Sequence, residues 1–379
     1  MGEIIIKEVT SRRERRKFVD YPNQLYRNNP NYVPGFYGDD LDDWDEKKNP
    51  AFAHCEAKCF LAYEEGKIVG RIGAILNHKS NETWNTNRMR FSQVDFIDDS
   101  RVSDALFGAV ERWAREKGCD QVHGPLGFCD LDREGMLVEG FDRKSMFITY
   151  YNAPYYAEHL ERLGYRKDTD WIEFFIHVPT PDSKEGAMIS RLARRLEKQG
   201  KYHIAPLRRR SDYRPYVKEV FRLVNEAYAP LYGVVKLNEK QIERYASKFI
   251  PLVNPDYACF IVDENERMVA FGVTVPSLAD AMIRCRGRLF PFGWIPVLRA
   301  LSKNDTVDLL LIAVSPELQG STLIAMSFDH FIQSTHKNGI RFAETGPQLE
   351  TNVKIQSQWK FFEREQHKRR RCFVKDLGE

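Results

Sequence analysis

The chain has 379 residues, which is long for one hydrophobic core and indicates two or three domains at about 150 residues each. Its 57 Lys and Arg residues nearly balance 54 Asp and Glu residues, so the net charge of +3 excludes a general bias toward polyanions. No apolar run approaches the ~18 residues of a membrane span, and the seven cysteines form no Cys-x-x-Cys pair. We therefore expect a reduced, cytoplasmic protein without an integral membrane segment or a bound metal.

The first half of the chain alternates strand-like and helical segments. In chain order, we expect a strand at 3–9, a polar helix at 12–27, strands at 59–63, 67–76 and 91–97, a helix at 102–114, a strand at 121–124, a helix at 155–163 and a strand at 171–178. The helix at 102–114 is the clearest, because its apolar residues recur at helical spacing. Gly118 is its natural C-terminal stop.

The segment Pro179–Ser183 is the best linker in the chain, since two prolines and small polar residues mark a break in composition. Beyond it we expect a basic amphipathic helix at 188–198, a strand near 203–207, a helix at 213–227, paired strands within 258–270, a long strand at 307–314 and a helix at 323–338. The predicted domains are therefore 1–178 and 187–379, joined by a linker at 179–186.

The two halves repeat each other. Residues 58–70 and 258–270 both predict a strand, a charged turn and a second strand. Gly118 followed by Gly124-Pro125 is matched by Gly339 followed by Gly346-Pro347. Repetition at this distance indicates two copies of one domain. The expected fold is mixed α/β, with a β-α-β-β-β-α-β-α-β order in each copy and a largely antiparallel mixed sheet flanked by helices.

This order and its details resemble the GNAT superfamily of acyl-CoA N-acyltransferases, in tandem. In the second copy, residues 307–321 resemble the family's fourth strand and pyrophosphate loop, whose amides and following helix hold the coenzyme. Gln319 stands at the first loop position, but Thr322 and Ile324 replace the two glycines of the family pattern. The resemblance implies acetyl-CoA or a longer acyl-CoA as co-substrate of this copy. The coenzyme-binding residues that it implies are Ile312, Val314, Gln319, Gly320, Ser321, Thr322 and Asn352.

Residues 350–359 resemble the family's fourth helix, with Asn352 where a coenzyme-contacting Asn stands. Trp359 falls where many members place the Tyr that protonates the departing thiolate. An indole N–H has negligible acidity in water and cannot perform that step. Glu344, on the preceding strand, is the candidate base for the incoming amine through a water. The alternative for Glu344 is a solvated carboxylate at a strand end.

The first copy has two carboxylates, Asp98 and Asp99, where a pyrophosphate would lie, and they would repel it. We therefore expect no acyl-CoA in this copy. Residues 124–142 interleave glycines, carboxylates and aromatic residues, and tyrosines follow soon after. Such a loop is either a substrate site or a surface Ω-loop packed on its own apolar residues. The candidate substrate residues are Asp130, Asp132, Glu139, Asp142, Tyr155 and Tyr156.

Two further segments stand out. The apolar run 289–301 lies between the third and fourth strands of the second copy, among basic residues. An interfacial helix or an acyl-chain lid is conceivable there, but packing between the two domains is the expectation. The basic run Lys368–Arg371 is expected to be a solvated chain end, although its charge could attract nucleic acid.

The expected reaction is transfer of an acyl group from a thioester to the amine of a small molecule or peptide, with a strand amide near 312–314 polarising the carbonyl. One alternative resembles the Fem aminoacyltransferases, which also pair two GNAT-like domains but use aminoacyl-tRNA. The basic patches at 191–210 and at the tail weakly favour it. Another is a non-catalytic ligand-binding or regulatory protein. Acceptor identity, acyl chain length and oligomeric state stay open.

Overall fold

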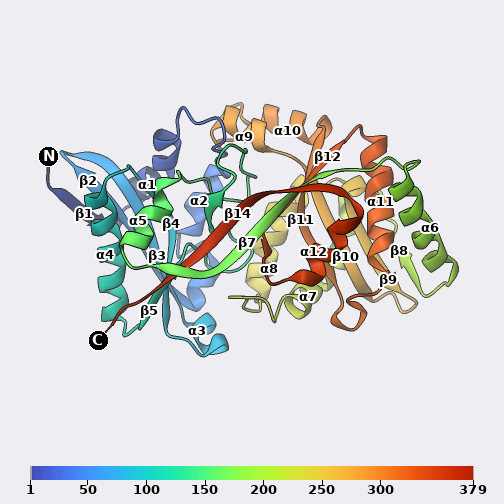
Figure 1. Ribbon diagram of the computed structural model, residues 1–379, viewed down its shortest axis with the longest axis horizontal. Coiled ribbons are helices and arrows are strands. Elements are labelled where there is room, and N and C mark those ends of the chain that lie inside the picture. Colours follow the sequence, from blue (N-terminus) through green and yellow to red (C-terminus); the bar gives the residue numbers. More distant parts are fainter. Residues whose placement is uncertain (1, 379) are drawn as a thin grey trace. The chain divides into compact units, whose positions relative to one another are not determined.

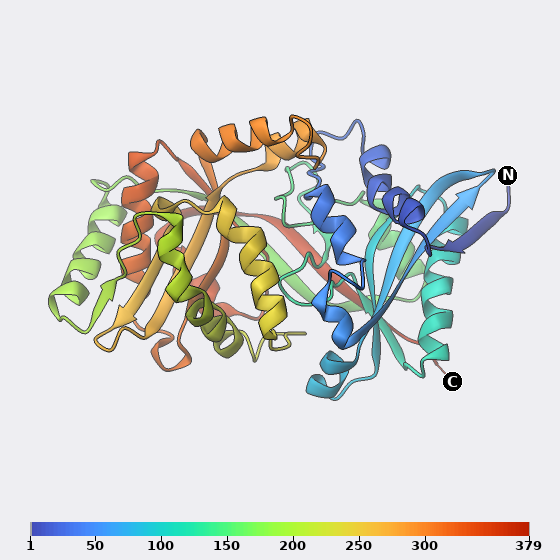
Figure 2. The same cartoon turned by 180° about the vertical axis from the view of Figure 1, so that it is seen from behind.

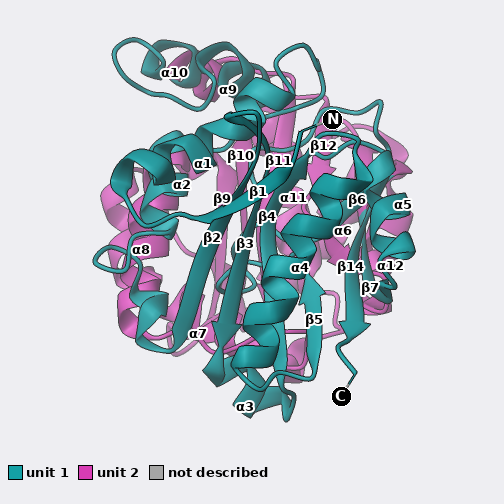
Figure 3. Cartoon of the chain, turned by 90° about the vertical axis from the view of Figure 1, so that its left-hand side faces the viewer, with its two compact units in different colours: residues 1–172, 278–297, 368–379 teal, residues 173–277, 298–367 magenta. Residues whose placement is uncertain are grey.

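The computed structural model describes residues 2–378, which form two compact units (Figures 1, 2 and 3). Unit 1 contains the chain up to Ile172, the segment Leu278–Val297 and the chain from Lys368 onward, whereas unit 2 contains Glu173–Ser277 and Leu298–His367. The units are therefore not contiguous in sequence, unlike the predicted domains 1–178 and 187–379. The predicted mixed α/β class with a largely antiparallel sheet is confirmed. No helix among the described residues is both long and apolar enough to cross a membrane.

The predicted helices and strands of unit 1 are present in the predicted order, together with additional elements. The elements of this unit are β1 (Ile4–Glu8), α1 (Arg12–Leu25), α2 (Tyr37–Asp43), β2 (Cys55–Glu64), β3 (Lys67–Asn77), α3 (His78–Trp84), β4 (Arg88–Phe96), α4 (Ser100–Glu116), β5 (Gln121–Gly124), β6 (Met136–Glu139), α5 (Tyr155–Arg162) and α9 (Ala279–Cys285). Of these, α2, α3, β6 and α9 are the additional elements. Three further elements have residues in both units, namely β7 (Arg166–His177), α10 (Trp294–Ser302) and β14 (Glu363–Asp376).

The sheet of unit 1 has the order β1-β2-β3-β4-β5-β14, and only the β4–β5 pair is parallel. Strand β2 shows why both faces are covered, because alternate residues of a strand point to opposite faces. Phe60 and Ala62 join the core cluster beneath α4 and α5. Cys59 and Leu61 join the cluster beneath α1. Figure 3 shows α4 lying along the strands on its side of the sheet.

Unit 2 repeats this arrangement. Its elements are α6 (Lys184–Lys198), β8 (Tyr202–Ile204), α7 (Val217–Ala227), α8 (Glu239–Phe249), β9 (Ala258–Asp263), β10 (Met268–Pro276), β11 (Thr306–Val314), α11 (Ile324–Lys337), β12 (Phe342–Thr345), β13 (Gln348–Leu349) and α12 (Val353–Gln358). The sheet order is β7-β12-β11-β10-β9-β8, with only β11–β12 parallel. Helix α7 packs on β10 and β11 and is joined by α8, in front of the strands in Figure 2. Helix α11 packs on α6, β9 and β10.

Each unit is completed by a strand from the other copy. The last strand of the chain, β14, pairs antiparallel with β5 in unit 1, where Phe373 faces Gly124. The last strand of the first copy, β7, pairs antiparallel with β12 in unit 2, where Phe175 faces Glu344. The two copies have thus exchanged their final strands.

The basic run Lys368–Arg371 is part of β14, so its prediction as a solvated chain end is wrong. Lys368 is 1% and Arg370 is 0% exposed. Arg369 and Arg371 both pair with Asp170, at 3.2 and 2.8 Å. The Asp170 carboxylate balances the charge of Arg369 and Arg371, whereas the buried Arg370 guanidinium donates a hydrogen bond to the Tyr150 carbonyl.

The expected burial of the apolar run 289–301 is not found for most of its large side chains. Phe290 is 84% and Phe292 is 71% exposed, and Leu298 is 55% exposed. Of this run, Val297 is buried, at 5%. The apolar composition of the run suggested a core position, but its short helix α10 directs most of these side chains outward.

We predict that Phe373→Ala destabilises unit 1 by about 3–5 kcal/mol, the usual cost of removing a buried ring from a packed core. Phe373 is fully buried in the same cluster as α4, although about 250 residues separate the two along the chain. Urea unfolding followed by far-UV circular dichroism measures the change. Phe361→Ala removes a ring that is 54% exposed and should cost far less. An equal, small effect of both substitutions would contradict the placement of β14 in unit 1.

Candidate functional site

The edge of strand β11 in unit 2 opens where β12 ends. The two strands pair from Thr306–Phe342 to Leu309–Thr345, and the Leu309 carbonyl accepts a final hydrogen bond from Gly346 N–H at 3.1 Å. Strand β11 then continues to Val314. On its other side, Val273 and Thr274 of β10 face Leu311 and Leu309, so Leu310 forms a β-bulge. A bulge changes the side to which the following peptide groups point.

The bulge turns the peptide groups of Ile312 and Val314 toward the open edge. The Ile312 carbonyl accepts a hydrogen bond from the Tyr228 hydroxyl at 2.9 Å, and the Val314 carbonyl accepts one from the Gln319 side chain at 3.4 Å. In a strand, the N–H and C=O of one residue point to the same side. The N–H groups of Ile312 and Val314 therefore line the same edge, which is the geometry needed to polarise a carbonyl group.

The loop after β11 leads to a helix N-terminus without a side-chain cap. Gly320 has a left-handed φ of +83°, and residues 319–322 are exposed. Neither Thr322 nor Ile324 has a positive φ, so their β-branched side chains do not strain this loop. Leu323 stands at the N-cap of α11 and provides no side-chain hydrogen bond. The Leu323 N–H donates to Ser321 Oγ at 3.3 Å, and the Ala325 and Met326 N–H groups donate to the Thr322 and Leu323 carbonyls. No carboxylate caps the positive end of the α11 dipole.

The equivalent helix of the first copy is capped by its own carboxylate. Asp99 is the N-cap of α4, and its side chain accepts a hydrogen bond from Arg101 N–H at 2.9 Å. Its hydrogen bonds to the Arg101 guanidinium lower the pKa of Asp99. Asp98 pairs with His159 at 2.9 Å. Two carboxylates therefore occupy the position that the second copy leaves open.

Asn352 and Trp359 both have partners within unit 2. The Asn352 side chain caps α12 by accepting a hydrogen bond from Ile355 N–H at 3.4 Å. The buried Trp359 donates its indole N–H to Gln348 Oε1 at 3.0 Å and packs against Phe328. The indole N–H is thus engaged in a structural hydrogen bond.

Glu344 lies in a mostly buried polar cluster, which rules out the solvated strand-end carboxylate. Its side chain is 12% exposed, and Oε1 lies 3.4 Å from Nε2 of His367, which is 3% exposed. Glu173 is fully buried, and the ligand atoms of these three residues all lie within 4.8 Å of one another. Glu344 is level with Asp308 of β11, four residues before Ile312 and so roughly 13 Å along the strand.

The four carboxylates predicted at 124–142 have different surroundings. Asp132 accepts hydrogen bonds from Phe128 N–H and Cys129 N–H and so closes a turn. Asp130 is half-buried. Glu139 is 59% exposed and pairs with Arg369, and Asp142 is 84% exposed. Burial, reinforced by the carboxylate of Asp130, raises the pKa of Glu134 well above its ordinary value; this residue was not among the predicted ones.

The predicted tyrosines of α5 support the core of unit 1. Tyr156 is fully buried, stacks on Phe96 at 4.2 Å and shares a hydrogen bond of 2.7 Å with the Tyr26 hydroxyl. Tyr155 donates its hydroxyl to the Phe96 carbonyl at 2.5 Å. Both side chains therefore hold α5 against β4.

A small cavity of about 20 Å³ lies elsewhere in unit 1, enough for roughly one water. Two ion pairs line it. Arg71 pairs with Asp95 at 2.7 Å with both side chains 6% exposed, and Arg133 pairs with Asp40 at 3.1 Å. Among its other lining residues are Tyr32, Tyr37, Tyr150 and Tyr151. Of these residues, the sequence drew attention to the loop that carries Arg133 and to the tyrosine run that follows it.

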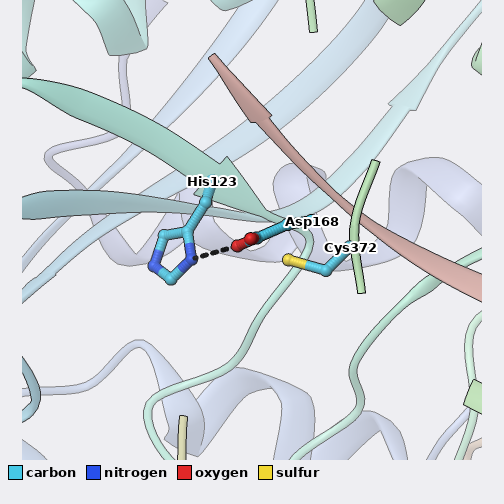
Figure 4. A group of neighbouring side chains, drawn as sticks. All are labelled: His123, Asp168 and Cys372. Carbon is cyan, nitrogen blue, oxygen red and sulfur yellow. Dashed lines mark ion pairs between the residues drawn. The ribbon is translucent and has the colours of Figure 1, made fainter. Parts of the chain in front are cut away.

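A second polar cluster in unit 1 joins three strands (Figure 4). The cluster contains His123 of β5, Asp168 of β7 and Cys372 of β14. A ring nitrogen, a carboxylate oxygen and the Sγ atom of these residues, each able to bind a metal, lie within 4.8 Å of one another. His123 Nδ1 lies 3.9 Å from Asp168 Oδ2, and Arg88 pairs with the same carboxylate at 3.0 Å. Burial lowers the pKa of His123 to about 4, so the ring is neutral at pH 7. The expectation of no metal rested on local cysteine spacing, which does not reveal a cluster of this kind.

Comparison with known proteins finds two curated relatives and solved structures with the same fold. No family model matches the chain. Protein YghO of Escherichia coli is 26% identical over 379 residues, covering 98% of this chain and 95% of that protein. A bacterial ceramide synthase of Caulobacter vibrioides is 27% identical over 302 residues, covering 78% and 76%. A solved tandem GNAT protein from the clavulanic acid biosynthesis pathway covers 100% of this chain and 99% of its own, with a TM-score of 0.56 and 12% identity.

The chain has the GNAT-superfamily fold in tandem. This confirms the fold that the duplicated pattern predicted. Strand β11 and the loop before α11 contain the segment 307–321, which the sequence analysis likened to the fourth strand and pyrophosphate loop of the GNAT superfamily. The sites of donor and acceptor stay predictions.

We predict that burial of neutral His123 makes unit 1 less stable in acid. Its folded pKa of about 4 lies below the ordinary value of 6.5, so between these pH values the unfolded state binds the proton and the folded state does not. Unfolding free energy should fall by about 3 kcal/mol as the pH drops from above 6.5 to 4. Urea unfolding at several pH values measures this slope.

His123→Gln should remove that part of the slope, because glutamine does not titrate. His78→Gln is the matched control, since the His78 side chain is 57% exposed. A slope in His123→Gln as steep as in the wild type would show that other groups cause the acid sensitivity.

Proposed function

We propose that the protein is an N-acyltransferase, in which unit 2 binds an acyl-CoA and passes its acyl group to the amine of a long-chain amino alcohol. The proposed binding of acyl-CoA to unit 2 rests on a difference between the N-termini of two equivalent helices. The N-terminus of α4 is capped by Asp99, whereas that of α11 has no side-chain cap and follows an exposed loop. A pyrophosphate needs the second arrangement.

The acceptor class is suggested by the ceramide synthase relative. A ceramide carries its fatty acyl chain on the nitrogen of a long-chain amino alcohol, so such a synthase forms an amide bond. That reaction fits the acyl transfer expected from the resemblance. The aminoacyl-tRNA alternative loses part of its basis, because the basic tail is a strand of unit 1 with Lys368 and Arg370 buried.

In the proposed reaction the amine nitrogen attacks the thioester carbonyl, the C–N bond forms, and the C–S bond breaks. The N–H groups of Ile312 or Val314 stabilise the negative charge on the carbonyl oxygen. An alkyl amine resembles lysine, with a pKa near 10.4, and must first lose a proton. Glu344, with His367 beside it, lies roughly 13 Å along the strand from Ile312, so it accepts that proton through a chain of several waters. The CoA thiolate needs little help, since a thiol pKa is near 8.5.

We predict that palmitoyl-CoA raises the thermal unfolding midpoint of the protein, as any ligand of the native state does. Ser321→Glu should abolish this shift without lowering the midpoint of the free protein, because it puts a carboxylate on the exposed loop before α11. Ser247→Glu on the exposed side of α8 is the matched control and should keep the shift. An unchanged shift in Ser321→Glu would refute the placement of the coenzyme. A shift with bulk tRNA in place of CoA would favour the aminoacyl-tRNA alternative.

We predict that Glu344→Gln lowers the rate of amide formation by about 10²–10⁴-fold while it keeps the thermal shift with palmitoyl-CoA, since it removes a base and not the donor site. The assay follows release of CoA thiol from palmitoyl-CoA with sphinganine as acceptor. Glu363→Gln, an exposed residue at the start of β14, should leave the rate unchanged. Trp359→Phe should also change the rate little, because its indole bonds to Gln348. Full activity of Glu344→Gln would exclude this carboxylate as the base.

A further inference from the structure

The segment Leu289–Lys303 presents large apolar side chains to solvent. They are Phe290 (84% exposed), Phe292 (71%), Leu298 (55%), Trp294 (45%) and Ile295 (41%). Single exposed apolar residues are common on proteins, but a contiguous group marks a surface that another phase or molecule covers. Three of the five are aromatic, the type enriched at the boundary between water and lipid.

The residues just before this docking segment (Leu289–Lys303) are fixed by contacts within unit 1. The Gly287 carbonyl accepts a hydrogen bond from Tyr37 N–H at 2.9 Å. Gly287 has a φ of +74°, and a Cβ there would lie 2.1 Å from the Gly35 carbonyl, so only glycine fits this approach. The next residue, Arg288, stacks on the Tyr37 ring at 4.2 Å and pairs with Asp20 at 2.7 Å.

The turn that carries the two phenylalanines is also folded. Trp294 donates its indole N–H to the Pro291 carbonyl at 3.1 Å. A Cβ at Gly293 would lie 1.8 Å from the Arg288 carbonyl, which shows how closely the turn closes. Val297 anchors α10 by its buried side chain. The exposed rings therefore belong to a structured element.

The charged residues within 281–303 all have one sign. Residues 281–303 contain no Asp or Glu. Arg284, Arg286, Arg299 and Lys303 are exposed, whereas Arg288 is paired with Asp20. The preceding carboxylate, Asp280, pairs with Lys144 at 2.6 Å. The docking segment therefore combines exposed apolar side chains with exposed cations. This combination complements a partner whose surface is anionic and whose interior is apolar.

We propose that the docking segment binds the surface of an anionic lipid bilayer. The aromatic side chains enter the level of the headgroups, and the four exposed cations contact lipid phosphates. Helix α10 has nine residues, far fewer than the roughly 20 of a membrane span, so the segment lies in the interface. This inference does not depend on the proposed reaction, although it would bring the protein to the place where lipid amines are found.

Vesicle flotation tests the proposal with the full chain. Wild-type protein should float with vesicles of phosphatidylcholine and phosphatidylglycerol at a 7:3 molar ratio, and much less with phosphatidylcholine alone. Binding should weaken in 0.5 M NaCl, which shortens the screening length to a few ångströms. Failure of the wild type to float with the anionic vesicles overturns the proposal.

Two double variants separate the apolar from the electrostatic contribution. Phe290→Ser with Phe292→Ser should reduce the bound fraction at least ~10-fold, because little apolar surface then enters the interface. Arg284→Glu with Arg286→Glu should remove the preference for anionic vesicles. The matched control is Val353→Ser with Phe361→Ser, which changes exposed apolar residues of unit 2 (65% and 54%) and should float like the wild type.

Two further results would overturn the proposal. One is flotation of the phenylalanine variant equal to that of the wild type. The other is a wild-type dimer in light scattering that becomes monomeric in the phenylalanine variant, with no flotation of either, since the segment would then join two copies. The palmitoyl-CoA thermal shift should be the same in wild type and phenylalanine variant, which separates failure of this inference from failure of the proposed function.

Discussion

The pairing of β14 with β5 is the interaction on which unit 1 depends. Four residue pairs, from Phe373–Gly124 to Asp376–Gln121, join the end of the chain to a strand about 250 residues earlier. The pairing places Phe373 in the core, sets Cys372 beside His123 and buries Lys368 and Arg370. It also brings Arg369 and Arg371 beside Asp170 of β7, whose carboxylate balances their charge. Without β14 the sheet of unit 1 would end at β5.

The same fold, used twice, provides two different electrostatic environments. Both copies have a helix after their fourth strand, and both helices have a positive N-terminal end. In unit 1 that end is satisfied internally by Asp99, so it contributes to stability. In unit 2 the cap position is Leu323, which has no polar side chain, and no carboxylate caps the end. One residue at the N-cap can thus decide whether a carboxylate occupies a helix end, with little effect on the sheet that carries it.

Local patterns in the sequence predicted the elements well. The apolar spacing of 102–114 predicted α4, which spans Ser100–Glu116, and Gly118 follows it with a positive φ. The duplication predicted the tandem arrangement, because both copies preserve the same turns. These signals are local and do not depend on distant partners.

The parts that the sequence did not predict depend on distant partners. The run of arginines in β14 resembles a solvated tail until Asp170 is brought beside it. Arg71 and Asp95 are 24 residues apart on neighbouring strands, and His123, Asp168 and Cys372 come from three strands. The docking segment shows the reverse problem, since its composition is that of a core, yet its turn exposes the rings. For Glu344, the sequence could name the residue but not the buried partners that surround it.

The exchange of final strands also has a consequence for how the protein is made. Domains of a nascent chain generally fold as units from the N-terminus while synthesis continues. Here the first copy cannot complete its sheet until residues 368–376 of β14 have left the ribosome, since β14 pairs with β5. Until then one edge of β5 is unpaired, a state that invites association with other chains. Expression of the first copy alone would leave that edge of β5 open, so completion of its sheet depends on the second copy despite the duplicated design.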